Sequence, residues 1–110
     1  MKQDLQVKNR IKEILKMVQE VAPGNSVELR IPPYAAIQCV SGSVHRRGTP
    51  PNVVEMSGDT LIKLVENPTC WDKFCYEGLI SASGTNANLE DLFTKVSRLD
   101  RSSSRGCDGQ

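Results

Sequence analysis

The spacing of apolar residues switches repeatedly between helical and alternating along this chain. Between Leu5 and Ala22 the apolar positions follow one stripe of a helix, which Pro23-Gly24 ends. Residues 26–31, SVELRI, alternate apolar and charged side chains as a half-buried strand does. From Asn88 onward helical spacing returns. The chain must therefore place at least two amphipathic helices against a sheet.

Further strands are predicted in the middle of the chain. Pro32-Pro33 ends the first strand, because proline cannot donate to a strand ladder. Two more strands are expected at residues 34–40, YAAIQCV, and 52–56, NVVEM. The segment between them, residues 41–51, is rich in turn-forming residues and predicts a loop. Residues 79–83, LISAS, predict a fourth strand.

Two short helices are predicted between the third and fourth strands. Ser57 is expected to cap the first of them and Thr69 the second, which ends at Gly78. The order of elements predicts an α+β sandwich, a mostly antiparallel sheet with helices packed on one face. We expect one domain over residues 1–100 and a disordered tail over residues 101–110, which lack an apolar period.

Composition excludes several classes of partner. The chain has 110 residues, a formal net charge of +1 and 25% charged residues, so nothing in the overall charge favours nucleic acid or an anionic membrane. The N-terminal segment has no uninterrupted apolar run, so we expect neither a signal peptide nor a membrane span. We therefore expect a cytoplasmic protein without an integral membrane segment.

The cysteines do not form a metal-binding pattern. Cys39, Cys70, Cys75 and Cys107 form no CxxC pair, and His45 is the single histidine of the chain. Structural zinc sites need closely spaced thiols, so we expect no metal and no cofactor. The first three cysteines are expected to be small buried apolar residues and Cys107 to be reactive.

The segments PPYAAIQCV and RGTPPNVVE, with the later strand LISASG, point to a known family. The chain resembles the small bacterial (actinobacterial) branch of the sterol carrier protein superfamily. The resemblance extends from Val27 to about Phe93. It implies an α+β fold with an apolar, lipid-binding tunnel between the sheet and the helices.

The leading functional hypothesis is a non-catalytic protein that binds or carries a fatty acyl chain or another lipid. Apolar periodicity and the resemblance together assign the tunnel walls, with Arg46 or Arg47 as a contact for the ligand headgroup. The assigned wall residues are Ile37, Cys39, Val54, Met56, Leu61, Leu64, Ile80, Leu89 and Phe93. Ordinary core packing is the alternative role for each of them.

The loop at residues 41–51 allows three interpretations. His45 with Cys39 would suit nucleophilic catalysis, but no glycine-rich turn supplies an oxyanion hole, so we expect no enzyme. Arg46 and Arg47 would suit an anion site, because the guanidinium group binds oxyanions in a bidentate way. Alternatively, the loop is solvated and its arginines pair with Glu55 or water.

The energetic cost of an empty tunnel limits the ligand-free state. An empty cavity of about 300 Å³ would cost roughly 7 kcal/mol, close to the ~5–15 kcal/mol that stabilises a whole domain. We therefore expect a tunnel that is filled with lipid, covered by a partner, or collapsed around Trp71, Phe74 and Met56. The collapsed form leads to a second hypothesis, an interaction domain that uses its sheet edge or first helix to form a homodimer or to dock onto a partner.

Overall fold

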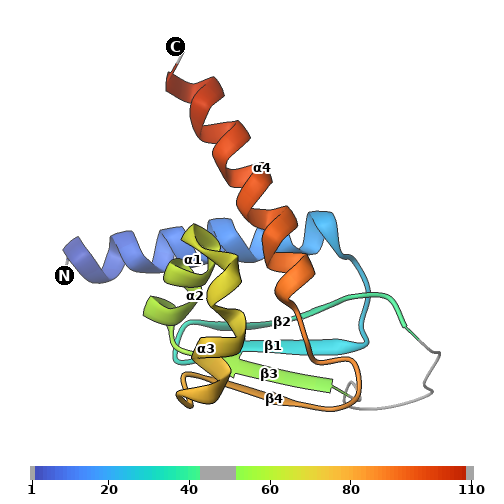
Figure 1. Ribbon diagram of the computed structural model, residues 1–110. Coiled ribbons are helices and arrows are strands. Elements are labelled where there is room, and N and C mark those ends of the chain that lie inside the picture. The colour runs from blue at the N-terminus through green and yellow to red at the C-terminus, as the bar shows by residue number, and fades with distance from the viewer. Residues whose placement is uncertain (1, 43–51, 109–110) are drawn as a thin grey trace.

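The computed structural model describes the backbone of residues 2–42 and 52–108 and the side chains of residues 5–42 and 52–102 (Figure 1). The elements follow the predicted order, with one added 3₁₀ turn, and the α+β class is confirmed. They are α1 Lys2–Val21, β1 Val27–Ile31, β2 Ala35–Cys39, β3 Asn52–Met56, α2 Gly58–Glu66, η1 Pro68–Cys70, α3 Trp71–Tyr76, β4 Ile80–Ser83 and α4 Glu90–Asp108.

The described strands form one sheet in the order β2-β1-β3-β4. The β1–β2 and β3–β4 pairs are antiparallel, as predicted, whereas β1 and β3 are parallel. Leu29 therefore lies opposite Ile37 on one side and Val54 on the other. Parallel neighbours need a crossover of roughly a dozen residues or more, and the long stretch between Ile31 and Asn52 supplies it. The spacing of apolar residues does not reveal this pairing.

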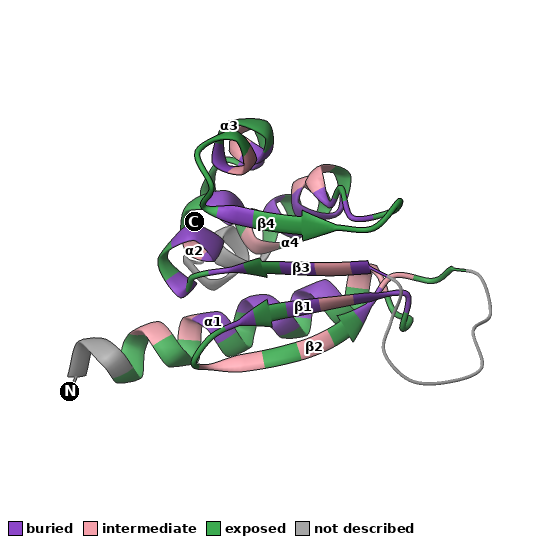
Figure 2. Ribbon diagram, turned by 90° about the horizontal axis from the view of Figure 1, so that it is seen from below, coloured by how far each residue is buried: buried purple, intermediate pink, exposed green. Residues whose placement is uncertain are grey.

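The helices lie over one face of the sheet, and the other face is open to solvent (Figure 1). Along β1, Val27, Leu29 and Ile31 are buried, while Glu28 is half-buried and Arg30 exposed (Figure 2). On the open face the Nε of Arg30 donates to the Oε2 of Glu28 at 2.9 Å. The alternation in SVELRI thus directs its apolar residues to the helices.

The ends of the short helices are only partly as predicted. Ser57 caps α2, since its Oγ accepts a hydrogen bond from the Thr60 amide at 3.1 Å. The predicted cap at Thr69 is wrong. Its hydroxyl donates to the Oδ1 of Asn67 at 2.7 Å, and the turn η1 already begins at Pro68. Proline suits the first position of a helical turn, which moves the start of the turn upstream of Thr69.

The last helix continues past the predicted domain boundary at residue 100. Helix α4 extends to Asp108, so the backbone of residues 101–108 is helical where a disordered tail is expected from the sequence. Adding residues to an existing helix costs little, which allows it to extend without an apolar stripe. Its C-terminal part projects away from the sheet (Figure 1). Within the described residues, no helix has the length and apolar character needed to cross a bilayer.

Candidate ligand pocket

The residues assigned to the tunnel walls lie mostly in a closed core. Cys39, Val54, Leu61, Leu64 and Phe93 are 0% exposed. A cavity wide enough for water would leave exposed area on the side chains around it, and these five have none. Met56, Ile80 and Leu89 are also buried. Ile37 is half-buried on the edge strand β2, and Arg46 and Arg47 lie outside the described residues.

Aromatic side chains fill the space between the sheet and the short helices. Trp71 and Phe93 stack with their ring centroids 6.4 Å apart and an angle of 24° between the ring planes. Phe74 and Met56 are buried in the same apolar cluster. This packing has the form expected for a collapsed tunnel. A ligand that entered here would have to displace these side chains.

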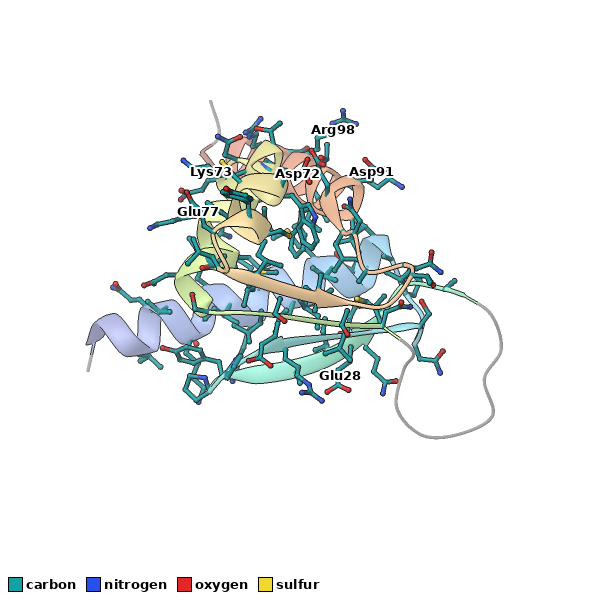
Figure 3. The ribbon with its side chains drawn as sticks, turned by 60° about the horizontal axis from the view of Figure 1, so that its bottom comes forward. Glu28, Asp72, Lys73, Glu77, Asp91 and Arg98 are labelled. Carbon is teal, nitrogen blue, oxygen red and sulfur yellow. The ribbon has the colours of Figure 1, made fainter. Side chains whose placement is uncertain are left out.

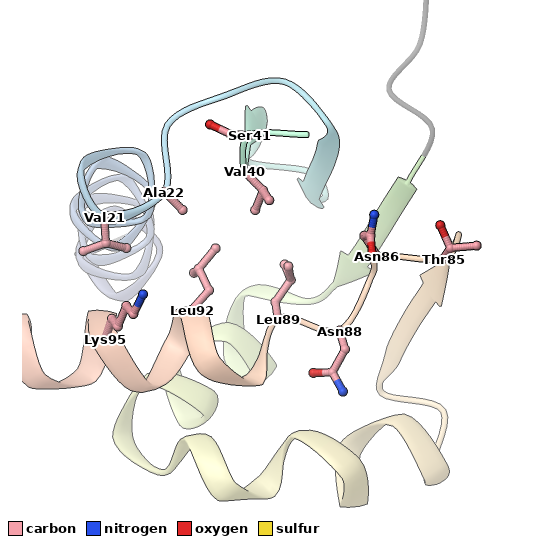
Figure 4. A pocket seen from close by; sticks show the side chains of 10 residues that line it. All are labelled: Val21, Ala22, Val40, Ser41, Thr85, Asn86, Asn88, Leu89, Leu92 and Lys95. Carbon is pink, nitrogen blue, oxygen red and sulfur yellow. The ribbon is translucent and has the colours of Figure 1, made fainter. Parts of the chain in front are cut away.

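A separate pocket of about 510 Å³ lies at the end of the molecule where α1, β2 and α4 meet (Figure 4). Among the wall residues assigned from the sequence, Leu89 alone belongs to it. We call it the α1–α4 pocket. Its lining residues are Val21, Ala22, Val40, Ser41, Thr85, Asn86, Asn88, Leu89, Leu92 and Lys95.

The floor of the α1–α4 pocket is apolar. Leu92 lies in the first turn of α4 and Leu89 directly precedes that helix. Val40 follows β2, Val21 is the last residue of α1, and Ala22 follows it. The side chains of Val40, Leu89 and Leu92 point toward one another across the pocket (Figure 4). Both leucines are buried, whereas the other three residues are half-buried. The floor therefore presents apolar surface that the fold does not cover completely.

Val40 is held in an unusual backbone conformation. Its φ angle is 67°, in the left-handed region that β-branched residues rarely adopt. The Val40 amide donates to the carbonyl of Ala22 at 2.7 Å, and its own carbonyl accepts from the Ser26 amide at 2.9 Å. These two bonds join the end of β2 to the connection between α1 and β1. They offset the strain and fix the position of Val40 on the pocket floor.

Gly24 makes this close approach possible. Its φ angle is 144°, and a Cβ at this position would overlap the backbone carbonyl of Val40. A side chain here would push β2 away from the end of α1. The Pro23-Gly24 pair, which the sequence identifies as a helix stop, therefore also shapes the pocket.

Asn52 connects the pocket rim to the sheet. Its side chain is buried, with Nδ2 donating to the Ser26 carbonyl at 2.9 Å and Oδ1 accepting from the Asn86 amide at 3.0 Å. One residue thus joins β1, β3 and the connection between β4 and α4. Sequence reasoning missed this role. The available signal was its position in the strand: Asn52 lies two residues before Val54 and four before Met56, so its side chain is on the same inward face.

Polar groups surround the opening of the pocket. Ser41, Thr85, Asn86, Asn88 and Lys95 line it and are exposed to solvent. The Oδ1 of Asn88 accepts from the Glu90 amide at 2.9 Å and caps α4. Among the described residues, Lys95 forms no ion pair. The pocket thus combines an apolar floor with a rim to which, among the described residues, Lys95 contributes a positive charge.

Cys39, which the sequence suggested as a nucleophile, lies in the apolar core. Burial raises the pKa of the Cys39 thiol to about 11, so the thiol is protonated at neutral pH. His45 lies outside the described residues. Over residues 2–42 and 52–108, no group of three or more His, Cys, Asp or Glu side chains is placed to hold a metal ion.

Comparison with known families agrees with the fold and with the quoted segments. The family model described as "Bacterial SCP ortholog", where SCP stands for sterol carrier protein, matches residues 3–94. The match includes all the described strands, α1, α2 and α3, and the start of α4. A search of curated proteins found no match. Because the family model covers most of the chain, the protein belongs to the bacterial sterol carrier protein-like family.

Proposed function

We propose that this protein is a non-catalytic, cytoplasmic carrier that binds one acyl chain in the α1–α4 pocket. Membership of the sterol carrier protein-like family supports lipid binding at a coarse level. The observation that carries the finer proposal is the convergence of apolar side chains from α1, the end of β2 and α4 on one open pocket. The helix–sheet interior offers no comparable space around Leu61, Leu64 and Phe93.

The size and lining of the pocket suit a single chain. Its volume of about 510 Å³ lies within the range of ~300–1,000 Å³ typical of small-molecule sites. Each buried methylene contributes about 0.8 kcal/mol, so ten of them give roughly 8 kcal/mol before association costs. Taken alone, roughly 8 kcal/mol corresponds to a dissociation constant of about 1 μM, and association costs of about 4 kcal/mol weaken it toward the millimolar range. Such an affinity suits a carrier that must also release its ligand.

The rim favours a ligand with a carboxylate headgroup. Lys95 lies beside Leu92 on the side of α1, while Asn86 and Asn88 lie beyond Leu89 at the opposite side of the pocket (Figure 4). A chain seated on Leu89 and Leu92 could therefore place its headgroup at Lys95. A fatty acid presents one negative charge, which Lys95 would pair with. Arg46 or Arg47, outside the described residues, remains a further proposed headgroup contact.

A pair of matched substitutions tests the location of the site. Ala22→Trp would fill the α1–α4 pocket, while Ala36→Trp adds the same ring on the exposed outer face of β2. With palmitate as the probe, calorimetric titration should show at least tenfold weaker binding for Ala22→Trp and unchanged binding for Ala36→Trp. Equal affinity in both variants would place the ligand elsewhere.

A second substitution tests the headgroup contact. Lys95→Gln should weaken palmitate binding about three- to tenfold, the effect of losing one partly screened charge. Binding of hexadecanol, which has the same chain without the carboxylate, should change less than twofold. An equal loss for both ligands would show that Lys95 acts through packing and not through charge.

The second hypothesis, an interaction domain that forms a homodimer, is supported by the filled helix–sheet interior and by one exposed apolar pair. Tyr76 and Leu79, where α3 turns into β4, are 93% and 47% exposed. Native mass spectrometry of gently purified protein tests it. A dimer without lipid that Tyr76→Ser or Leu79→Ser dissociates would favour this hypothesis. A monomer with co-purifying lipid would favour the carrier.

A further inference from the structure

A second cavity lies on another side of α4. It has a volume of about 270 Å³ and lies between η1 and the middle of α4. We call it the η1–α4 groove. Asn67 and Thr69 line one wall, and Ser97, Arg98 and Arg101 line the other. It shares no lining residue with the α1–α4 pocket.

The η1–α4 groove carries positive charge that forms no ion pair with a described carboxylate, although Asp100, the partner of Arg10, lies close enough to Arg101 to attract it. Its lining includes two arginines and no carboxylate. Asp72 and Asp91, which Figure 3 labels together with Arg98, form no ion pair with it. Arg101 donates from Nη2 to the carbonyl of Glu66 at 3.3 Å, and its other guanidinium donors make no further bond to described residues.

A hydroxyl without a hydrogen-bond partner among the described residues lines the same groove. Ser97 is 3% exposed, and its side chain forms no hydrogen bond with any described group. Among the described residues, the fully buried side-chain atom that lacks a partner is the Oγ of Ser26, so the Oγ of Ser97 keeps some access to the groove. Serine in a helix usually satisfies itself on the carbonyl four residues earlier, as Thr94 does on Glu90 at 2.9 Å. The unpaired Ser97 hydroxyl is thus available to a ligand.

The opposite wall supplies a further donor. The Oδ1 of Asn67 accepts from the Thr69 hydroxyl at 2.7 Å, which orients the amide and leaves Nδ2 unbonded. Donors therefore come from both walls: two guanidinium groups and a hydroxyl from α4, and an amide from the residue before η1. A carboxylate has two oxygens to satisfy them, whereas a phosphate monoester has three strong acceptor oxygens.

We propose that the η1–α4 groove binds a phosphate group. Arg98 and Arg101 make the charge-assisted hydrogen bonds to its oxygens, and Ser97 and Asn67 add neutral ones. The phosphate comes either from a small soluble molecule or from the headgroup of a lipid, since both present the same oxygens. This site is independent of the acyl-chain proposal, because it uses different residues on a different side of α4.

Amide NMR with inorganic phosphate as the probe tests the site. At constant ionic strength, phosphate should produce saturable shifts of the amides of Asn67, Thr69 and residues 97–101, while chloride should not. The double variant Arg98→Gln/Arg101→Gln should weaken binding at least tenfold. Lys63→Gln/Lys73→Gln removes the same charge from exposed positions on α2 and α3 and should change binding less than twofold. Ser97→Ala should weaken it several-fold with the helix intact.

Vesicles distinguish the two sources of phosphate. If vesicles of phosphatidylcholine with phosphatidic acid bind the protein, and the Arg98→Gln/Arg101→Gln variant does not bind them, the lipid headgroup is the source. If inorganic phosphate binds and these vesicles do not, the source is soluble. The proposal is overturned if neither probe binds in a way that requires Arg98 and Arg101. It is equally overturned if the lysine control loses as much affinity as the arginine variant.

Discussion

Arg10 of α1 and Asp100 of α4 form a two-point ion pair, although 90 residues separate them in the sequence. The distance from Nη1 to Oδ1 is 3.0 Å and that from Nη2 to Oδ2 is 2.9 Å. Arg10 also pairs with Glu13 on its own helix at 2.8 Å. The pair joins the two terminal helices, which also meet at the α1–α4 pocket.

Breaking this ion pair should destabilise the fold measurably. Asp100→Asn keeps the shape of the side chain and removes its charge, so we expect a loss of about 1–2 kcal/mol in the free energy of unfolding. Glu28→Gln removes the partner of Arg30 on the open face of the sheet and should cost less than ~0.5 kcal/mol. Urea denaturation of both variants checks the difference. Equal costs would mean that the Arg10–Asp100 contact adds nothing beyond a surface pair.

The same ion pair should make stability depend on acid pH. The Asp100 pKa is lowered, chiefly by its hydrogen bond with Arg10. Because the carboxyl is more acidic in the folded state, its contribution is complete above the unfolded pKa of about 4 and is lost as pH falls further. Wild-type protein should therefore lose more stability between pH 5 and pH 2 than Asp100→Asn does. Parallel pH profiles of the two proteins would contradict this.

Two glycine substitutions separate strain from steric overlap. Gly24→Ala adds a Cβ that overlaps Val40 at a positive φ angle, so we expect a loss of at least about 3 kcal/mol in unfolding free energy. Gly78 has a φ angle of 80° and no atom within 4 Å of an added Cβ. Gly78→Ala should therefore lower the free energy of unfolding only by the backbone strain of a positive φ angle, about 1–2 kcal/mol. Thermal unfolding measures both, and equal costs would show that the approach to Val40 is not tight.

The hydrogen bonds of Asn52 should contribute strongly to stability. Asn52→Ala removes one of the hydrogen bonds that the Ser26 carbonyl accepts and leaves the Asn86 amide without its acceptor. We expect a loss of about 2–3 kcal/mol in the free energy of unfolding. Gln38→Ala, at an exposed position on β2, should change stability by less than ~0.5 kcal/mol. In the Asn52 variant, amide exchange should also be faster at residues 84–88. Unchanged exchange there would show that the network does not hold the pocket rim.

The buried thiol of Cys39 should be inert in the folded protein. With its pKa raised to about 11, only about one thiol in a thousand ionises at pH 8. Iodoacetamide should label Cys39 only after unfolding, whereas the half-buried Cys70 reacts earlier. Since the pKa of Cys39 is higher in the folded state, the protonated thiol contributes to the free energy of unfolding. This contribution is complete below pH ~9 and declines as pH rises toward 11. Rapid labelling of native Cys39 would contradict its burial.

The local elements could be predicted from the sequence because they depend on near neighbours. The stripe from Leu89 to Leu99 predicted α4, the alternation around Leu29 predicted β1, and Ser57 was identified as a cap. The parallel pairing of β1 with β3 depends on where a long connection returns, which no local pattern encodes. The cap at Thr69 failed because Pro68 starts the turn earlier.

The pocket was harder to predict than the fold. Apolar periodicity identifies which residues face inward, so Leu61, Leu64 and Phe93 were assigned to a tunnel that their packing closes. The pocket arises from a backbone feature, the left-handed conformation of Val40, and from its contacts with Ala22 and Gly24. Neither feature follows from residue type, because valine seldom adopts this conformation.

The most direct test of the account is an NMR measurement of which methyl groups contact a bound fatty acid. With ¹³C-labelled palmitate, we expect intermolecular nuclear Overhauser effects to the methyls of Val40, Leu89 and Leu92, and none to Leu61 or Leu64. That result would place the acyl chain in the α1–α4 pocket. Contacts to Leu61 and Leu64 instead would show that the ligand opens the space between helices and sheet, and would contradict the account.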